Sequence, residues 1–147
     1  MSARIALLDV NVLVALFDPD HPHHEPAHDW LAANRSSGWA TCPLTEIGLL
    51  RILSNVAYSG TPLQADAVRE RLTAFCESGQ HEFYPNDVSL LEPGRFRLAG
   101  VAHRQLTDVY LLGLAVHQGG RLATFDRGIP RQTVLGAGPD QLVVIPA

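Results

Sequence analysis

Four acidic residues lie in parts of the sequence that are otherwise apolar. Asp9 ends the run RIALLD (residues 4–9), and Asp126 ends the similar run RLATFD (residues 121–126). Glu46 and Asp108 each share a helical stripe with leucines at positions i+3 and i+4. A carboxylate taken out of water without a partner costs roughly several kcal/mol or more. Four such residues in one chain therefore indicate a shared chemical role.

The predicted elements place these acids at one edge of a sheet. Short apolar runs that alternate with helical segments predict an α/β fold, in which helices cover both faces of a parallel sheet. The expected strands are residues 4–9, 39–42, 82–85, 121–126 and 141–146, and the expected helices are 11–17, one ending near 35, 43–55, 64–77, 87–94 and 107–118. Parallel strands present their carboxyl ends at the same rim, so Asp9 and Asp126 should meet there. Glu46 and Asp108 lie in the first turns of helices that start close to this rim.

Carboxylates gathered on one rim repel each other, so either some are protonated or a cation lies between them. Oxygen ligands without histidine or cysteine suit Mg²⁺ or Mn²⁺, which activate water and stabilise charge on a phosphoryl group under attack. The hypothesis is that one or two such ions are held, directly or through water, by Asp9, Glu46, Asp108 and Asp126. Taken singly, some acids have simpler explanations, with Asp126 as a turn residue, Asp108 as a first-turn charge and Glu46 as part of a helix cap.

The segments that carry the acids also resemble a known family. LLDVNVLVALF (7–17), PLTEIGLLRIL (43–53) and LTDVYLLGLAVHQGGRLATFD (106–126) are together similar to PIN-domain ribonucleases, above all to the VapC-like toxins of bacterial toxin–antitoxin pairs. The resemblance covers nearly the whole chain, and it implies an α/β/α sandwich around a parallel sheet ordered 3-2-1-4-5. Its acidic positions fall on the four acids above, while Asn11 and Thr124 would orient ligands or water.

The resemblance also implies an activity and partners. Family members cleave RNA with Mg²⁺ or Mn²⁺, and hydrolysis would leave a 5′-phosphate and a 3′-hydroxyl. They usually form homodimers and are held inactive by a cognate VapB-like antitoxin. We expect such an antitoxin to cover the apolar helical region from Leu49 to Tyr58. The alternative is a PIN-like module that binds RNA or an antitoxin without cleaving RNA.

Composition sets further bounds. The 147 residues predict a single domain, 1–147, and the formal net charge of −4, with arginine as the only basic residue besides histidine, argues against tight non-specific nucleic-acid binding. Cys42 and Cys76 are expected to be free thiols. The apolar run after Arg4 is interrupted by Asp9 and Asn11, and it is shorter than the ~20 residues that a membrane helix needs. We therefore expect a soluble cytoplasmic protein without a membrane segment.

The segment GRFRLAGVAHR (residues 94–104) is the candidate RNA contact. Arginine can bind a phosphate, and an aromatic ring such as Phe96 can stack on a base. The candidate RNA-binding residues are Arg95, Arg97, His103 and Arg104. A plain solvated loop is the competing interpretation.

A second motif suggests a different enzyme class. HEPAH (residues 24–28) matches the zinc-protease pattern H-E-x-x-H through His24, Glu25 and His28. Pro26 lacks an N–H and fits only the first turn of a helix, and no third ligand is evident. A zinc metalloprotease is therefore a remote alternative, and a partly exposed helix start is the expected structure.

Overall fold

A parallel sheet of five strands forms the centre of the protein in a computed structural model that describes residues 4–147. Its order is β3-β2-β1-β4-β5, which confirms the predicted topology. The strands are β1 (Ala6–Leu8), β2 (Trp39–Thr41), β3 (His81–Phe83), β4 (Arg121–Thr124) and β5 (Leu142–Val144). Leu8 of β1 lies beside Ala123 of β4, so the residues that follow these two strands emerge at the same edge.

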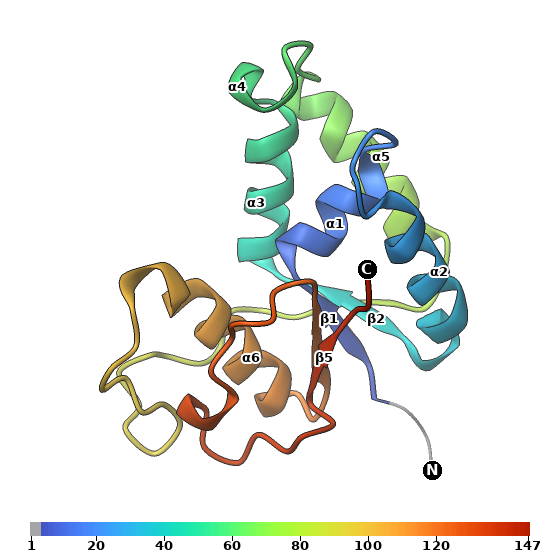
Figure 1. Cartoon of the computed structure of the whole chain (residues 1–147). Coiled ribbons are helices and arrows are strands. Elements are labelled where there is room, and N and C mark those ends of the chain that lie inside the picture. The colour runs from blue at the N-terminus through green and yellow to red at the C-terminus, as the bar shows by residue number, and fades with distance from the viewer. Residues whose placement is uncertain (1–3) are drawn as a thin grey trace.

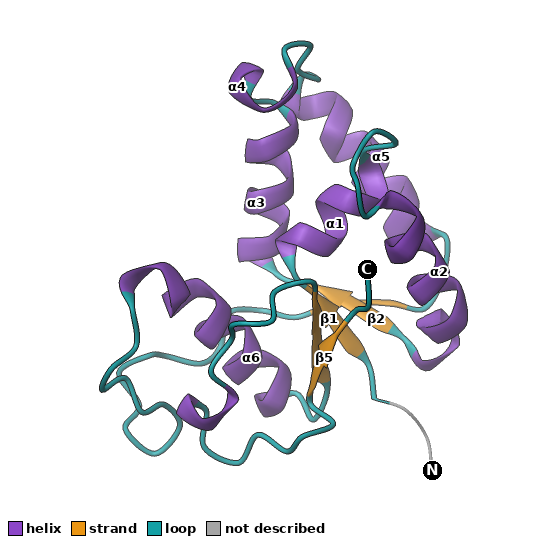
Figure 2. Cartoon of the chain, viewed as in Figure 1, coloured by secondary structure: helices purple, strands orange, loops and turns teal. Residues whose placement is uncertain are grey.

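Helices cover both faces of the sheet and complete an α/β/α sandwich (Figures 1 and 2). They are α1 (Val10–Phe17), α2 (His24–Asn34), α3 (Pro43–Leu53), α4 (Val56–Ser59), α5 (Ala65–Glu77) and α6 (Leu106–His117). Figure 1 shows α1, α2, α3 and α5 on one side of the sheet and α6 on the other. None of the helices described in residues 4–147 combines the length and the hydropathy that a membrane span requires.

The sheet separates two apolar cores. One lies under α1, α2, α3 and α5, and Trp39 packs there against Phe75 with 4.8 Å between ring centroids. The other lies under α6 and includes Leu111, Leu112 and Phe96. Cys42 is buried, Cys76 is partly buried, and both are free thiols, as expected.

The structure corrects two predicted segments. Residues 87–94 form turns instead of a helix, because Ser89 and Glu92 offer the backbone other partners. The Ser89 N–H donates to the Glu92 carboxylate over 2.7 Å, and the Leu91 N–H donates to the Ser89 hydroxyl over 3.1 Å. Between the predicted helices 43–55 and 64–77 the structure contains a further short helix, α4, which Asn55 caps by accepting a hydrogen bond from the Ala57 N–H.

Candidate active site

Asp9 lies directly after β1 and caps the N-terminus of α1. Only 4% of its surface is exposed. One carboxylate oxygen accepts a hydrogen bond from the Val10 N–H over 2.7 Å, and the other accepts from the Thr124 hydroxyl over 2.8 Å. Burial nevertheless raises the pKa of Asp9, and the nearby charge of Asp126 raises it further. Asp9 is therefore a buried acid whose ionised form needs more positive charge than the fold supplies.

Thr124, at the end of β4, links Asp9 to two other groups. Its hydroxyl donates to Asp9 and accepts from the Asn11 side-chain amide over 3.2 Å and from the Asp126 N–H over 3.0 Å. The side-chain carbonyl oxygen of Asn11 in turn accepts a hydrogen bond from the Phe125 N–H over 3.1 Å. One donated and two accepted bonds use the full capacity of a hydroxyl. Asn11 and Thr124 thus fix the positions of Asp9 and of the chain leading to Asp126.

Asp108 and Asp126 complete a group of three aspartates. Asp108 lies in the first turn of α6, and burial together with the charges of Asp9 and Asp126 raises its pKa to about 7. The neighbouring Asp126 carboxyl group also adds to this shift through a side-chain interaction. Asp126 is exposed, and it also accepts from the Gly128 N–H over 2.7 Å, so it is a turn residue as well.

Glu46 does not join this group in the structure. It lies in the first turn of α3, as predicted, but its side chain lines a separate cavity with Leu50, Cys76 and His81. Burial alone raises the pKa of Glu46, and the acids that act on Asp108 do not include it. The physical reason is that α3 has two inward faces. Gly48 lies against Val10 of α1, whereas Glu46 faces the side of α3 that meets α5 and β3.

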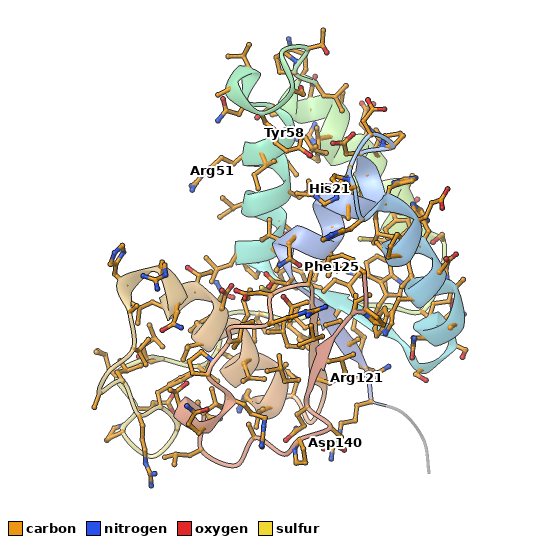
Figure 3. All side chains as sticks on the ribbon, in the orientation of Figure 1. His21, Arg51, Tyr58, Arg121, Phe125 and Asp140 are labelled. Carbon is orange, nitrogen blue, oxygen red and sulfur yellow. The ribbon has the colours of Figure 1, made fainter. Side chains whose placement is uncertain are left out.

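A cavity of about 590 Å³ adjoins the aspartates. Its lining consists of Asp9, Val10, Asn11, Val14, His21, Ile52, Asn55, Ala57, Tyr58 and Asp108. Figure 3 shows Tyr58 on α4 and His21 in the loop after α1, with Phe125 nearer the sheet. Sequence reasoning did not select His21, Asn55 or Tyr58 for this site. No spacing pattern marks them, because they converge only through the packing of α4 and a loop against α1 and α3.

The segment 94–104 is only partly available for RNA. Arg95 is partly buried, and its Nε lies 3.5 Å from a Glu92 oxygen. Phe96 is 4% exposed and forms a bridge with Val134, so it is a core residue and not a stacking platform. The remaining candidates, Arg97, His103 and Arg104, are exposed.

The two histidines of HEPAH have a structural role. Ring nitrogens of His24 and His28 lie 2.7 Å from the Ala15 carbonyl and 2.9 Å from the Leu16 carbonyl, respectively. These carbonyls belong to the last turn of α1, where the helix itself supplies no donors. Among residues 4–147 no three histidine, cysteine or acidic side chains form a group that could hold a metal ion by themselves. The described residues, 4–147, therefore give no support to the zinc-protease alternative.

The aspartates do fit a hard cation by their chemistry. Their donors are all oxygens. Burial first, and then the charges of neighbouring aspartates, raise the pKa values of Asp9 and Asp108, and a bound cation would stabilise the ionised forms. The lack of a closed three-ligand group in the described chain is compatible with Mg²⁺, which usually binds through one or two carboxylates together with water and substrate phosphates.

Comparison with known proteins identifies the family to which this chain belongs. The PIN domain profile matches residues 6–134. The chain belongs to the PIN-domain family. Among curated relatives from Mycobacterium tuberculosis H37Rv, ribonuclease VapC38 is 43% identical over 125 residues, covering 85% of this chain and 87% of the relative. Ribonuclease VapC39 is 44% identical over 128 residues, covering 84% and 90%, and ribonuclease VapC44 is 39% identical over 143 residues, covering 95% and 99%. The resemblance to VapC-like PIN domains is thus confirmed.

Proposed function

We propose that this PIN domain is an endoribonuclease toxin of the VapC type that depends on Mg²⁺ or Mn²⁺. The observation that carries this proposal is the convergence of Asp9, Asp108 and Asp126, from three distant parts of the chain, at one edge of the sheet. The names and identities of the ribonuclease relatives support RNA as the substrate.

The aspartates share one role in the proposed reaction, and neighbouring polar residues hold them in place. Asp9, Asp108 and Asp126 would hold the ion, which when bound activates water and neutralises charge on the phosphate. Because its pKa is raised to about 7, Asp108 must be ionised before it can act as a ligand. Thr124 and Asn11 keep the Asp9 carboxylate in place. Water adds to phosphorus and the bond to O3′ breaks, so the products carry a 5′-phosphate and a 3′-hydroxyl.

We also propose a cognate VapB-like antitoxin and a homodimer. Exposed apolar side chains on and after α3 support a covering partner, with Ile47 51%, Val56 64% and Leu63 39% exposed. Leu49, which the sequence placed in this surface, is instead fully buried. Co-expression with a small neighbouring gene should yield a stable complex with low nuclease activity, whereas two independently eluting proteins would count against the antitoxin. An RNA substrate and such an antitoxin would both place the protein in the cytoplasm.

The nuclease proposal is tested by incubating the purified protein with structured RNAs in Mg²⁺, Mn²⁺ or EDTA. Wild-type protein should cleave RNA only with metal, and Asp9→Asn should abolish cleavage while its thermal unfolding stays cooperative. Asp29→Asn, which neutralises an exposed acid on α2, is the matched control and should cleave normally. Cleavage in EDTA or normal cleavage by Asp9→Asn would refute the proposal. RNA binding without cleavage would favour the non-catalytic alternative.

A further inference from the structure

The aspartates account for only part of the cavity that they line. Asp9 and Asp108 contribute carboxylates, but much of the remaining wall is apolar and comes from Val10, Val14 and Ile52. Its volume of about 590 Å³ lies within the range of roughly 300–1,000 Å³ that is typical of pockets for small organic ligands. A phosphate alone would leave most of this space empty. The cavity is therefore large enough for a flat group attached to the phosphate.

Two side chains in the wall have hydrogen-bond donors to spare. The Asn55 side-chain oxygen is used to cap α4, where it accepts from the Ala57 N–H over 2.9 Å, so its amide NH₂ remains. Nδ1 of His21 accepts from the His23 N–H over 3.0 Å, which leaves the proton of a neutral ring on Nε2. Burial lowers the pKa of His21 and favours this neutral form. The wall thus combines apolar surface with donors suited to carbonyl oxygens and ring nitrogens.

Tyr58 adds an aromatic ring in a fixed position. Its hydroxyl donates to Asp18 over 2.6 Å, and Asp18 also accepts from the Asp20 N–H over 3.0 Å. Tyr58 as a whole residue is 39% exposed although its hydroxyl is satisfied, and it lines the cavity, so part of its surface is available to a ligand. Aromatic side chains held in this way stack on unpaired bases, and such stacking contributes about 1–3 kcal/mol per base.

We propose that this cavity binds one unpaired nucleobase of the RNA, next to the phosphate that is cleaved at the aspartates. The inference rests on the proposed nuclease function, and it assigns sequence preference to Tyr58, Asn55 and His21. The continuity of the cavity with Asp9 and Asp108 favours RNA over a protein segment, because an occupant must place a phosphate at these acids. Apolar walls, an aromatic ring and free donors are the features by which proteins recognise single-stranded RNA bases.

The first test compares cleavage sites. A pool of RNAs with randomised single-stranded loops is cut by wild type, Tyr58→Ala and Asn55→Ser, and the new 5′ ends are sequenced. Asn55→Ser keeps a capping oxygen but lacks the amide donor. Wild type should favour particular bases at one position beside the cut, and both variants should flatten that preference at least fivefold while still cleaving. Phe83→Ala, which removes an exposed aromatic ring outside this cavity, is the matched control and should keep the preference.

The second test measures base binding without catalysis. Asp108→Asn protein in EDTA is titrated with AMP, GMP, CMP and UMP, and amide NMR shifts are followed. We expect saturable shifts around Tyr58 and His21 for the preferred nucleotide. The double variant that carries both Asp108→Asn and Tyr58→Ala should show no such shifts. Unfolding of Tyr58→Ala would show as collapsed spectral dispersion, in which case Asn55→Ser takes its place.

The outcomes separate the two proposals. No cleavage by wild type under any metal condition refutes the nuclease, whereas metal-dependent cleavage with the base preference unchanged in both variants overturns only the base pocket. Unchanged preference together with weakened binding of a co-expressed antitoxin would assign the cavity to a protein partner instead.

Discussion

The Thr124 hydroxyl donates a 2.8 Å hydrogen bond to the Asp9 carboxylate, and the two residues are 115 positions apart in the chain. The same oxygen accepts hydrogen bonds from Asn11 and from the backbone of Asp126. A single hydroxyl therefore connects the strand ends that carry two of the three aspartates.

Removing this hydroxyl should weaken both the fold and the site. Thr124→Val keeps the shape of the side chain but leaves Asp9, Asn11 and the Asp126 N–H without a partner. Leaving a buried polar group unsatisfied costs about 1–3 kcal/mol. We therefore expect the free energy of unfolding, measured in urea, to fall by about 1–3 kcal/mol. Thr124→Ser keeps the hydroxyl and is the control, which should lose less. Equal stability of Thr124→Val and wild type would show that the hydroxyl is dispensable.

Neutralising Asp108 should stabilise the metal-free protein near pH 7.5. Its folded-state pKa of about 7 lies above the ordinary value of 3.8, so the folded state binds the extra proton between these values. Stability is therefore lost as pH rises through this window. Asp108 is half-buried and screened by solvent, so we expect a gain of only about 0.5–2 kcal/mol for Asp108→Asn in EDTA at pH 7.5.

Two comparisons test that explanation. The gain should shrink as the pH falls toward 4, where the wild-type carboxyl is already protonated, and saturating Mg²⁺ should shrink or reverse it by binding wild type more tightly. Asp29→Asn on α2 should show neither trend. A destabilised Asp108→Asn protein in EDTA at pH 7.5 would contradict the raised pKa that burial and the neighbouring aspartates give Asp108.

A substitution of Glu46 tests whether this residue belongs to the proposed metal site. Because Glu46 lines a different cavity from Asp9 and Asp108, Glu46→Gln should keep most of the metal-dependent cleavage that Asp108→Asn loses. The measurement is the initial rate on one structured RNA at saturating Mg²⁺. A loss comparable to that of Asp108→Asn would restore Glu46 to the metal site.

The sequence predicted the aspartates better than the glutamate for a geometric reason. Parallel strands end at one rim, so Asp9 and the residues after Thr124 had to emerge together. Helical spacing only groups residues on one face of a helix and does not say which neighbour that face meets. Glu46 shares its stripe with Leu49 and Leu50 as predicted, but α3 is packed between α1 and α5, and the stripe alone could not choose between them.

The cavity beyond the aspartates was harder to predict. Asn55 is the last residue of the predicted helix 43–55, Tyr58 lies beyond that helix, and His21 lies in a histidine-rich turn. Their proximity depends on tertiary packing between segments without regular spacing. The prediction for Phe96 was wrong. Its position among arginines suggested contact with RNA, but its ring is buried against α6.

Gly113 explains why Phe96 fits there. A Cβ atom at Gly113 would overlap the Phe96 ring, so Gly113→Ala should destabilise the fold by about 1–3 kcal/mol despite the better helix propensity of alanine. Placing the same change in a Phe96→Leu background should reduce its cost, and the double-mutant cycle in urea measures this coupling. Additive effects would show that the ring is not the obstacle.

Arg104 and Arg95 should differ in their effect on RNA. Arg104 is exposed, so Arg104→Gln should weaken RNA binding and reduce the slope of log affinity against log salt by about 0.7, as expected for one lost contact to a single strand. Arg95 lies 3.5 Å from Glu92, so Arg95→Gln should lower stability more than RNA affinity. Fluorescence anisotropy at several salt concentrations on Asp108→Asn protein measures both slopes. An unchanged slope for Arg104→Gln would exclude this arginine from the RNA path.

The pairing of β1 with β4 has a consequence for how the protein is made. The aspartates come from positions 9, 108 and 126, and β1 receives its β4 neighbour only after residue 124 has been added. A nascent chain that ends before residue 108 lacks two of the three aspartates, even when α1, α3 and α5 are already present. The three aspartates can therefore come together only late in synthesis, and the proposed nuclease activity is expected only after β4 has paired with β1.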